Sequence, residues 1–347
     1  MANSEERDLM RVGIVGATGF LGGELVRLLA AHPKVEIAAL CAHSNVDVPL
    51  AKVRPSLAAA GDLMLEAFDA DSLANNCDLV FLALPHGSSA IAARQLLEGG
   101  VRCIDLGSDF RLRMAADYPR WYGREAGWDE LPAGAIYSLP ELTGALPDST
   151  KLIANPGCFA TALALAITPL SPHLRVGTRL RVFGVTGSTG SGAKPTDKVH
   201  HSLRGTNFSA YKSLRHQHMG EVLQLLAGRS DHLPEIAFVP HSAPMARGIH
   251  LTLLIDRADL QLDPMDLLAD AYQKSPLVRV VEGELNMGQV IGSAGAVLGR
   301  VHDSSTWVVF AAIDNLLKGG SGQAVQNMNL WMGWDECLGL PRMGMWP

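Results

Sequence analysis

A cysteine stands where a turn passes into an apolar helix. Cys158 follows the turn sequence Asn155-Pro156-Gly157, and the apolar stretch 159–170 comes directly after it. The N-terminus of a helix stabilises a thiolate, which is the nucleophilic form of cysteine. Cys158 is therefore a candidate nucleophile, with a buried apolar residue and a metal ligand as the alternatives.

The other cysteines have less reactive surroundings. Cys41, Cys77 and Cys103 lie in or beside predicted strands, where cysteine usually serves as a small buried hydrophobic residue. The chain has five cysteines, an odd number, and no C-x-x-C pair. This pattern is typical of a reducing compartment and predicts no disulfide framework.

Two histidines can supply the acid and base that such a nucleophile needs. His216 and His218 stand two residues apart, just before an apolar helical run. Glu221 can hold His218, whereas His216 is nearer the preceding loop, so His216 is the weakly favoured proton carrier. The two histidines and Cys158 could also form a zinc site, but the chain has no second cysteine pair and no H-E-x-x-H motif. We expect no metal.

Four glycines at intervals of three residues mark a nucleotide-binding turn. Gly13, Gly16, Gly19 and Gly22 span the end of the first predicted strand and the start of its helix. Glycines let the backbone approach a pyrophosphate, which the free N–H groups of a helix start can bind. The pattern predicts a dinucleotide site. Its alternative is a tight turn that serves close packing alone.

The end of the second predicted strand indicates which dinucleotide is bound. An acidic residue at this place would bond the ribose hydroxyls of NAD. Here the sequence is Cys41-Ala42-His43-Ser44, without a carboxylate. We therefore expect NADP rather than NAD, with Ser44 near the 2′-phosphate. A nucleophilic cysteine beside a nicotinamide implies attack on an acyl carbon, a thioester, and hydride transfer between thioester and aldehyde.

The elements that must position these residues alternate in the first half of the chain. Predicted strands at 11–16, 35–41, 78–85, 101–107 and 151–155 are separated by helical segments, which predicts a parallel sheet. Residues 111–147 are expected to form a long irregular connection. Long strands follow at 178–186, 235–241, 249–256 and 306–314, and a helix with one apolar stripe is expected in 320–334.

The fold class is therefore α/β: a Rossmann dinucleotide-binding domain plus an α+β catalytic and dimerisation domain with a mixed, largely antiparallel sheet. We expect the first domain to cover residues 1–157, completed by a C-terminal helix in 318–347. The second should cover 158–317 and form a dimer or tetramer interface, since its apolar sheet needs cover.

Composition excludes several other classes of protein. The chain has 347 residues, of which 48% are hydrophobic and 18% charged, so it is not a disordered protein. The formal net charge of −6, without a cluster of lysine or arginine, argues against nucleic acid as a partner. The longest apolar run, 159–170, is too short to cross a bilayer, and the acidic N-terminus has no apolar core of a signal peptide. A cytoplasmic protein without a membrane partner is expected.

Taken together, these motifs resemble the N-acetyl-gamma-glutamyl-phosphate reductases of the aspartate-semialdehyde dehydrogenase superfamily. The matching stretches occur in family order from residue 12 to beyond 333: GATGFLGGELVRLL, LALPHGSS, IDLGSDFRL, YSLPEL, NPGCFAT, RHQHMGEV, VPHSAPMARGI and AIDNLLKGGSGQAVQNMNLWMG.

The resemblance implies roles for individual residues. Cys158 would carry the acyl group, and His216 and His218 would supply the acid and base. Arg111, Arg247 and Ser108 would bind the phosphate and carboxylate of the substrate, since guanidinium groups suit both anions. The implied contacts of the cofactor are Gly16, Thr18, Gly19, Phe20, Leu21, Gly22, Ser44, Pro85, His86, Gly87, Gly190 and Asn315.

The chain departs from the family pattern in the glycine-rich loop 184–195 and in the histidine motif. Thr186 and Thr189 replace serines, Ala193 stands where an arginine is usual, and Gly220 replaces a proline, which should loosen a helix start. No catalytic group is lost by these changes.

The implied activity is the NADPH-dependent reduction of N-acetyl-gamma-glutamyl phosphate to the semialdehyde in arginine biosynthesis. The alternatives are the homologous aminoadipyl-phosphate reductase of carrier-protein lysine biosynthesis and a catalytically inactive nucleotide-binding regulator.

Overall fold

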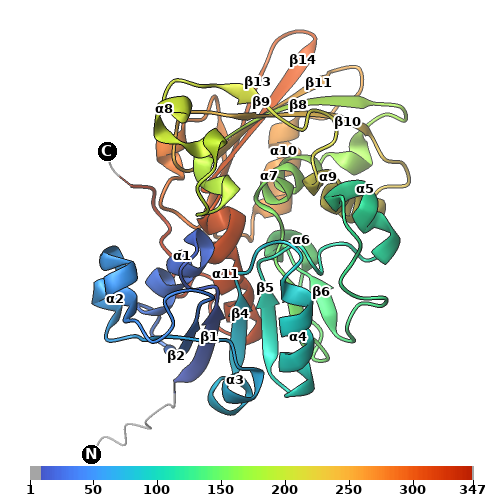
Figure 1. Cartoon of the computed structure of the whole chain (residues 1–347). Coiled ribbons are helices and arrows are strands. Elements are labelled where there is room, and N and C mark those ends of the chain that lie inside the picture. The colour runs from blue at the N-terminus through green and yellow to red at the C-terminus, as the bar shows by residue number, and fades with distance from the viewer. Residues whose placement is uncertain (1–8, 346–347) are drawn as a thin grey trace, which may run out of the picture.

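Two seven-stranded sheets organise the chain, one in each half (Figure 1). A computed structural model describes residues 9–345. The acidic N-terminal segment, from which we expected no signal peptide, lies largely outside the described residues, as do residues 346 and 347. No helix in the described chain is long and apolar enough to cross a membrane.

The first sheet is parallel throughout, as the alternating pattern predicts. Its strands, in spatial order, are β3 (Leu65–Glu66), β2 (Val35–Cys41), β1 (Met10–Val15), β4 (Leu79–Leu82), β5 (Arg102–Asp105), β7 (Leu152–Ala154) and β6 (Ala135–Tyr137). The order reverses between β1 and β4, where the loop after β1 leads into the first helix. In open α/β sheets ligands bind at such a switch point, beyond the carboxyl ends of the strands.

The helices of this half have apolar faces that pack on the sheet. They are α1 (Phe20–Leu29), α2 (Leu50–Val53), α3 (Ala70–Asn76), α4 (Ser89–Glu98) and α5 (Tyr118–Tyr122). A further short helix, α6 (Pro140–Thr143), has no buried residue, and its Leu142 packs against the core of the second sheet. The region 111–147 is thus not wholly irregular, because β6 adds an edge strand to the sheet and two short helices flank it. These elements are too short to show periodicity in the sequence.

The second sheet is mixed and largely antiparallel, which confirms the predicted fold class. Its strands, in spatial order, are β12 (Val278–Glu282), β13 (Ala296–His302), β14 (Thr306–Ile313), β11 (Ile249–Asp256), β8 (Arg179–Thr186), β10 (Glu235–Ser242) and β9 (Ser209–Ala210). We did not predict β12 and β13, which enlarge the sheet at one edge.

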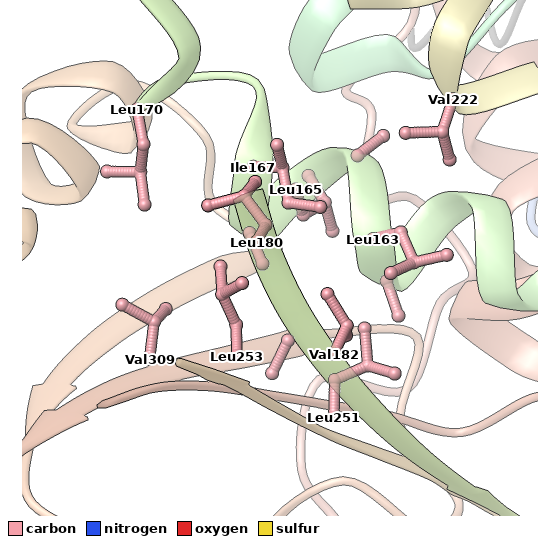
Figure 2. Close-up of a cluster of buried hydrophobic side chains, with 14 of the residues drawn as sticks. Leu163, Leu165, Ile167, Leu170, Leu180, Val182, Val222, Leu251, Leu253 and Val309 are labelled. Atoms are coloured by element: carbon pink, nitrogen blue, oxygen red, sulfur yellow. The ribbon is translucent and has the colours of Figure 1, made fainter. Parts of the chain in front are cut away.

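One face of the second sheet is covered by helices, and the main core lies between them (Figure 2). Alternate residues of β8 and β11, such as Val182 and Leu253, point toward Leu163 and Ile167 of the helix that begins at the cysteine turn. The helices of this half are α7 (Cys158–Ile167), α8 (His201–Arg204), α9 (His218–Ala227) and α10 (Pro264–Tyr272).

The last helix, α11 (Gly322–Trp331), packs in the core of the first sheet with α1 (Figure 1). The expected single apolar stripe is wrong, because residues 322–329 are all buried. Its polar side chains find partners instead: Asn327, for example, donates to the Ser138 carbonyl and accepts from the Ser138 hydroxyl. A helix buried on every side cannot be recognised from an amphipathic pattern.

A π-helical turn, Leu317–Ser321, leads into α11. Its N–H groups reach back five residues, from Gly319 to the Asp314 carbonyl and from Ser321 to the Leu316 carbonyl. Such turns frequently occur at functional sites.

Candidate active site

The cysteine turn has the predicted geometry, because α7 begins at Cys158 and Gly157 caps it without a side chain. The thiol is half-buried. Burial raises the pKa of the Cys158 thiol to about 11, although Arg111 and the N–H of Phe159 act in the opposite direction. The expected lowering by the helix terminus is therefore outweighed by desolvation. The resting residue is a thiol that has to lose its proton before it reacts.

A buried glutamate connects the cysteine turn to its surroundings. The Glu221 carboxyl group is fully buried and accepts hydrogen bonds from the Gly157 N–H (2.9 Å), the Tyr122 hydroxyl (2.8 Å) and the Tyr137 hydroxyl (2.9 Å). The guanidinium of Arg111 lies 3.6 Å from it. Glu221 thus fixes the residue immediately before the thiol.

His218 lies directly against the cysteine turn. A side chain on Gly157 would clash with the imidazole Nε2 of His218, which is 4.0 Å from a Glu221 oxygen. Its Nδ1 is buried and has no hydrogen-bond partner within residues 9–345. Burial first, and then the nearby cations, hold the pKa of His218 well below its usual range, so the imidazole is neutral at pH 7.

His216 is further enclosed. Its ring packs edge-on against the rings of Phe159, Tyr211, Phe238 and His218, and its Nδ1 accepts the N–H of His218. Burial lowers the pKa of His216 to about 3. The predicted pair therefore lies together, but the geometry assigns the place beside the cysteine turn to His218.

The two arginines expected to bind anions already have protein partners. Arg111 donates from Nε to the Asn155 carbonyl (2.9 Å) and from Nη2 to the Leu106 carbonyl (2.8 Å). Burial disfavours its charge, but Glu221 prevails and raises the pKa of the Arg111 guanidinium. Arg247 makes ion pairs with Glu24 and Asp314.

Ser108 and the Pro85-His86-Gly87 turn lie together near Arg124. The Ser108 hydroxyl accepts a hydrogen bond from Arg124 (3.1 Å), and Arg124 also pairs with Asp109. The buried Asp109 accepts from the N–H of Gly87 (2.7 Å) and so holds the turn. Burial lowers the pKa of His86 to about 4, with Arg111 adding to the effect.

The glycine turn after β1 fits a dinucleotide. A Cβ on Gly22 would clash with the carbonyl of Gly16, and one on Gly16, where φ is +90°, would clash with Ala83. Gly19 caps α1 without a side chain, and the first turn of α1 has no acidic residue. The N–H groups at this helix start can therefore face a pyrophosphate. Thr18 precedes the cap, and Phe20 is 41% exposed beside it.

The end of β2 differs from the sequence-based interpretation in two respects. Ser44 is exposed, as expected for a contact with the cofactor. However, pairing of β3 places Glu66 in register with Cys41, so a carboxylate does lie near this strand end. Arg54 is also close to the glycine turn, because its guanidinium donates to the Thr18 carbonyl at 2.7 and 3.2 Å.

The π-helical turn joins the glycine turn to the cysteine. A methyl group on Gly319 would lie 2.7 Å from the Cβ of Cys158, and one on Gly320 would lie 2.6 Å from the side chain of Leu21. The hydroxyl of Ser321 donates to the Leu21 carbonyl (2.8 Å). Both halves of the site thus pack against one short segment.

Asn315 and Gly190 lie in the second half of the chain. The Asn315 side chain accepts from the Gly248 N–H (2.7 Å) and donates to the Thr189 hydroxyl (3.1 Å). Gly190 is exposed in the same loop.

The structure explains one of the departures from the family pattern. Gly220 lets the ring of Trp121 pack against α9. Ala193 is exposed, and nothing in the structure explains its presence there.

Tyr122, Tyr137 and Arg54 were not predicted as residues of the site. Glu221 was predicted only as a residue that can hold His218. The tyrosines reach Glu221 from 99 and 84 residues away in the chain. Local sequence contains no sign of such contacts. For Glu221, its position three residues after His218 was the available signal.

Comparison with known proteins supports one family over the whole chain. A model of the semialdehyde dehydrogenase NAD-binding domain matches residues 11–147, and one of the semialdehyde dehydrogenase dimerisation domain matches residues 158–315. The chain is 39% identical over 346 residues to an N-acetyl-gamma-glutamyl-phosphate reductase of Neisseria gonorrhoeae, covering 97% of this chain and 99% of that one. Its identity to the enzyme of the same name from Desulforudis audaxviator is 39% over 350 residues, covering 98% and 100%.

Solved structures share the fold at much lower identity. Aspartate semialdehyde dehydrogenase II from Vibrio cholerae, complexed with ASA, superposes with a TM-score of 0.67 at 15% identity, over 94% of this chain and 98% of that one. The Candida albicans enzyme with NADP gives 0.67 at 14% identity, over 93% and 98%. A nicotinamide cofactor fits both the matched NAD-binding domain and the glycine turn. The full-length similarity and both domain matches show that the chain belongs to the N-acetyl-gamma-glutamyl-phosphate reductases of the semialdehyde dehydrogenase family.

Proposed function

We propose that this protein reduces N-acetyl-gamma-glutamyl phosphate to N-acetylglutamate 5-semialdehyde and phosphate with NADPH, through a thioester on Cys158. The observation that carries the proposal is the thiol at the first residue of α7, with a neutral imidazole against the preceding Gly157. Full-length relatives that bear the name of this activity support it. The step belongs to arginine biosynthesis in the cytoplasm.

The first half of the reaction forms the thioester. His218 accepts the proton of the Cys158 thiol, and the sulfur attacks the acyl carbon. A carbon–sulfur bond forms while the bond between that carbon and the phosphate oxygen breaks, and its electron pair leaves with phosphate. His218 rather than His216 is the proton carrier in this scheme, because it lies against the cysteine turn and its Nδ1 has no partner among the described residues.

The second half releases the aldehyde. When bound, the reduced nicotinamide supplies a hydride to the thioester carbon. The product of this addition is a thiohemiacetal alkoxide. As its oxygen re-forms the carbonyl of the aldehyde, the carbon–sulfur bond breaks with its electron pair on sulfur, and His218 gives its proton back to the sulfur of Cys158. Glu221 accepts the Gly157 N–H, and its carboxylate, 4.0 Å from His218, favours the imidazolium that forms when His218 takes the proton.

Mass spectrometry of the acylated enzyme tests the mechanism. Enzyme incubated with N-acetyl-gamma-glutamyl phosphate in the absence of NADPH should carry the acyl group on the peptide that contains Cys158. Cys158→Ser should abolish turnover and retain NADPH binding. An acyl group on another residue, or normal activity of Cys158→Ser, would overturn the thioester. Parallel assays with an aminoadipyl phosphate distinguish the alternative substrate.

The preference for NADPH is a separate part of the proposal. Residues 41–44 contain no carboxylate, and Arg54 beside the glycine turn offers a positive charge, whereas Glu66 near Cys41 acts against a 2′-phosphate. We expect kcat/KM to be higher with NADPH than with NADH. Ser44→Asp should shift the ratio toward NADH, and Lys52→Met serves as a control for loss of a nearby charge. Better activity of the wild type with NADH would refute the preference.

We also propose that residues 1–157 and the C-terminal segment 318–347 form the cofactor domain, with 158–317 as the catalytic and oligomerisation domain. The division of the strands between two sheets and the packing of α11 in the core of the first sheet support this.

A further inference from the structure

A lysine and a glutamate form an ion pair out of contact with water, and no step of the proposed reaction uses it. Lys318 belongs to the π-helical turn and Glu141 to α6, and the Nζ of Lys318 donates to the carboxylate of Glu141. Glu141 as a whole is half-buried, but the two side chains are 0% and 1% exposed. An apolar pair of the same volume is often as stable as a buried ion pair, so stability alone does not explain this one.

A third buried side chain connects the pair to α11. Gln326 accepts a hydrogen bond from the Nζ of Lys318 (2.8 Å) and donates one to the Glu141 carboxylate (2.9 Å). It also donates to Glu336 (2.7 Å) in the segment after α11. Burial by itself would raise the pKa of Glu141, but Lys318 and then Gln326 outweigh it and leave this pKa below its usual value. Glu141 is therefore a carboxylate at neutral pH, held in one orientation by two donors.

The residues that follow Lys318 contact both parts of the site. Gly319 lies against the Cβ of Cys158, and Gly320 lies against the first turn of α1, directly after the glycine turn. The Gly320 carbonyl also accepts a hydrogen bond from the side chain of Asn155 (3.2 Å), which stands at the start of the cysteine turn. One short turn thus touches both the nucleophile and the expected dinucleotide site.

The two glycines do not hold this geometry by themselves. Glycine is conformationally permissive, and π-helical turns are rare, so the shape of the turn depends on what anchors it. The side chain directly before Gly319 and Gly320 is that of Lys318, which is bonded to α6 through Glu141 and to α11 through Gln326. The turn is therefore clamped between these two helices on one side and the site on the other.

We propose that Lys318 and Glu141 are positioning residues, whose ion pair holds the π-helical turn so that the acylated Cys158 and the bound nicotinamide stand at the separation that hydride transfer needs. This inference rests on the proposed function. Both side chains are bonded away from solvent to α6 and α11, so they act through the backbone of Gly319 and Gly320. Formation of the thioester needs only Cys158 and its neighbours, and should depend on the pair much less.

A double variant separates positioning from stability. Removing one partner alone would leave an uncompensated buried charge, whereas Lys318→Met/Glu141→Gln removes both charges, keeps the volume and leaves Gln326 an amide to bond. Its melting temperature should lie within about 5 °C of the wild type. Arg300→Met/Asp263→Asn is the matched control, because it removes an ion pair with a largely buried arginine between β13 and the start of α10.

The two half-reactions are then measured one at a time. Release of phosphate in the first turnover without NADPH should stay within about threefold of the wild type, as should both KM values. Loss of NADPH absorbance on mixing with the acylated enzyme should slow by about ten- to a hundredfold in Lys318→Met/Glu141→Gln, because a small misplacement of the reacting atoms is costly. With NADPH deuterated at the transferred hydrogen, the isotope effect on kcat should rise in this variant and not in the control.

A second variant keeps both charges. Gln326→Met removes one hydrogen bond of Lys318 and one of Glu141, and it should slow hydride transfer about three- to tenfold with a smaller rise in the isotope effect. Wild-type hydride transfer in both variants would refute the proposal, and so would equal losses in phosphate release and hydride transfer, which indicate damage to the fold as a whole. If the wild type itself forms no thioester, the proposed function fails. If the wild type turns over and the variants match it, only the role of the ion pair fails.

Discussion

At the scale of single residues, opposing effects act on the thiol of Cys158. Burial raises its pKa to about 11, while Arg111 and the backbone N–H groups of the helix start favour the thiolate. Because the thiol is protonated at neutral pH, its alkylation rate should rise with pH, about tenfold per unit up to about pH 10. Iodoacetamide labelling followed by peptide mass spectrometry measures this, with Cys158→Ser as the blank. A rate that levels off near pH 7 would show that the free enzyme stabilises the thiolate.

Glu221 raises the pKa of Cys158 and also holds the catalytic turn. In Glu221→Gln the negative charge is lost, so the pKa of Cys158 should fall and alkylation at pH 8 should become faster. At the same time kcat should fall by about a hundredfold, because His218 and Gly157 lose their charged partner. Glu235→Gln, at an exposed residue, should change neither quantity. Slower alkylation together with lower kcat would indicate a general loss of structure, which a melting curve would reveal.

The residues of the site could be predicted to different extents. The turn sequence before Cys158 and the paired histidines are local signals, and both are where the sequence indicates. The choice between the histidines depends on which one touches Gly157, a contact between residues 61 positions apart that no local pattern encodes. The pKa of Cys158 could not be predicted either, because the amount of burial is a tertiary property.

At the scale of elements, the π-helical turn sets the space around the nucleophile. In Gly319→Ala the new methyl would lie 2.7 Å from the Cβ of Cys158, so either α7 or the turn has to move. We expect a loss of stability of about 1–3 kcal/mol and a lower rate of acylation. Gly228→Ala is the control, since its methyl would lie 3.9 Å from the nearest atom. Differential scanning fluorimetry and single-turnover kinetics would measure both, and wild-type values for Gly319→Ala would contradict close packing here.

Long periodic elements were predictable, and short or fully buried ones were not. Strands such as β2, β8, β11 and β14 follow the predicted ranges closely. The missed strands β3, β6 and β9 have two or three residues. Strands β12 and β13 are rich in valine, which is a strand signal that our prediction overlooked. The parallel sheet could be predicted because strands and helices alternate in the sequence. The position of β6 at the edge of this sheet could not be predicted.

At the scale of the whole molecule, one face of the second sheet is not covered by any α-helix of residues 9–345 (Figure 1). Across it, Val239, Phe183, Thr252 and Phe310 stand in one row by strand register, and Phe183 is 43% exposed. The matched family domain is described as a dimerisation domain. We propose that two copies of the chain associate through this face, which would bury the row.

Phe183→Asp tests this interface. An aspartate buried without a partner at the centre of an interface is strongly unfavourable, so the variant should sediment as a monomer at concentrations where the wild type is a dimer or larger. Ile91→Asp, at an exposed residue of α4 in the other half of the chain, should leave the mass unchanged. Analytical ultracentrifugation decides, and an unchanged mass of Phe183→Asp would place the contact elsewhere.

The π-helical turn also determines the rotation of α11, the helix that follows it, about its own axis. It contains one residue more than an α-helical turn, and each residue of a helix advances by about 100°. Deleting Gly320 would therefore rotate α11 by about that angle and turn Asn327 away from Ser138 and Asn155. A single-residue deletion at this point should damage the protein more than any single substitution within α11, because it misaligns every buried amide of the helix at once.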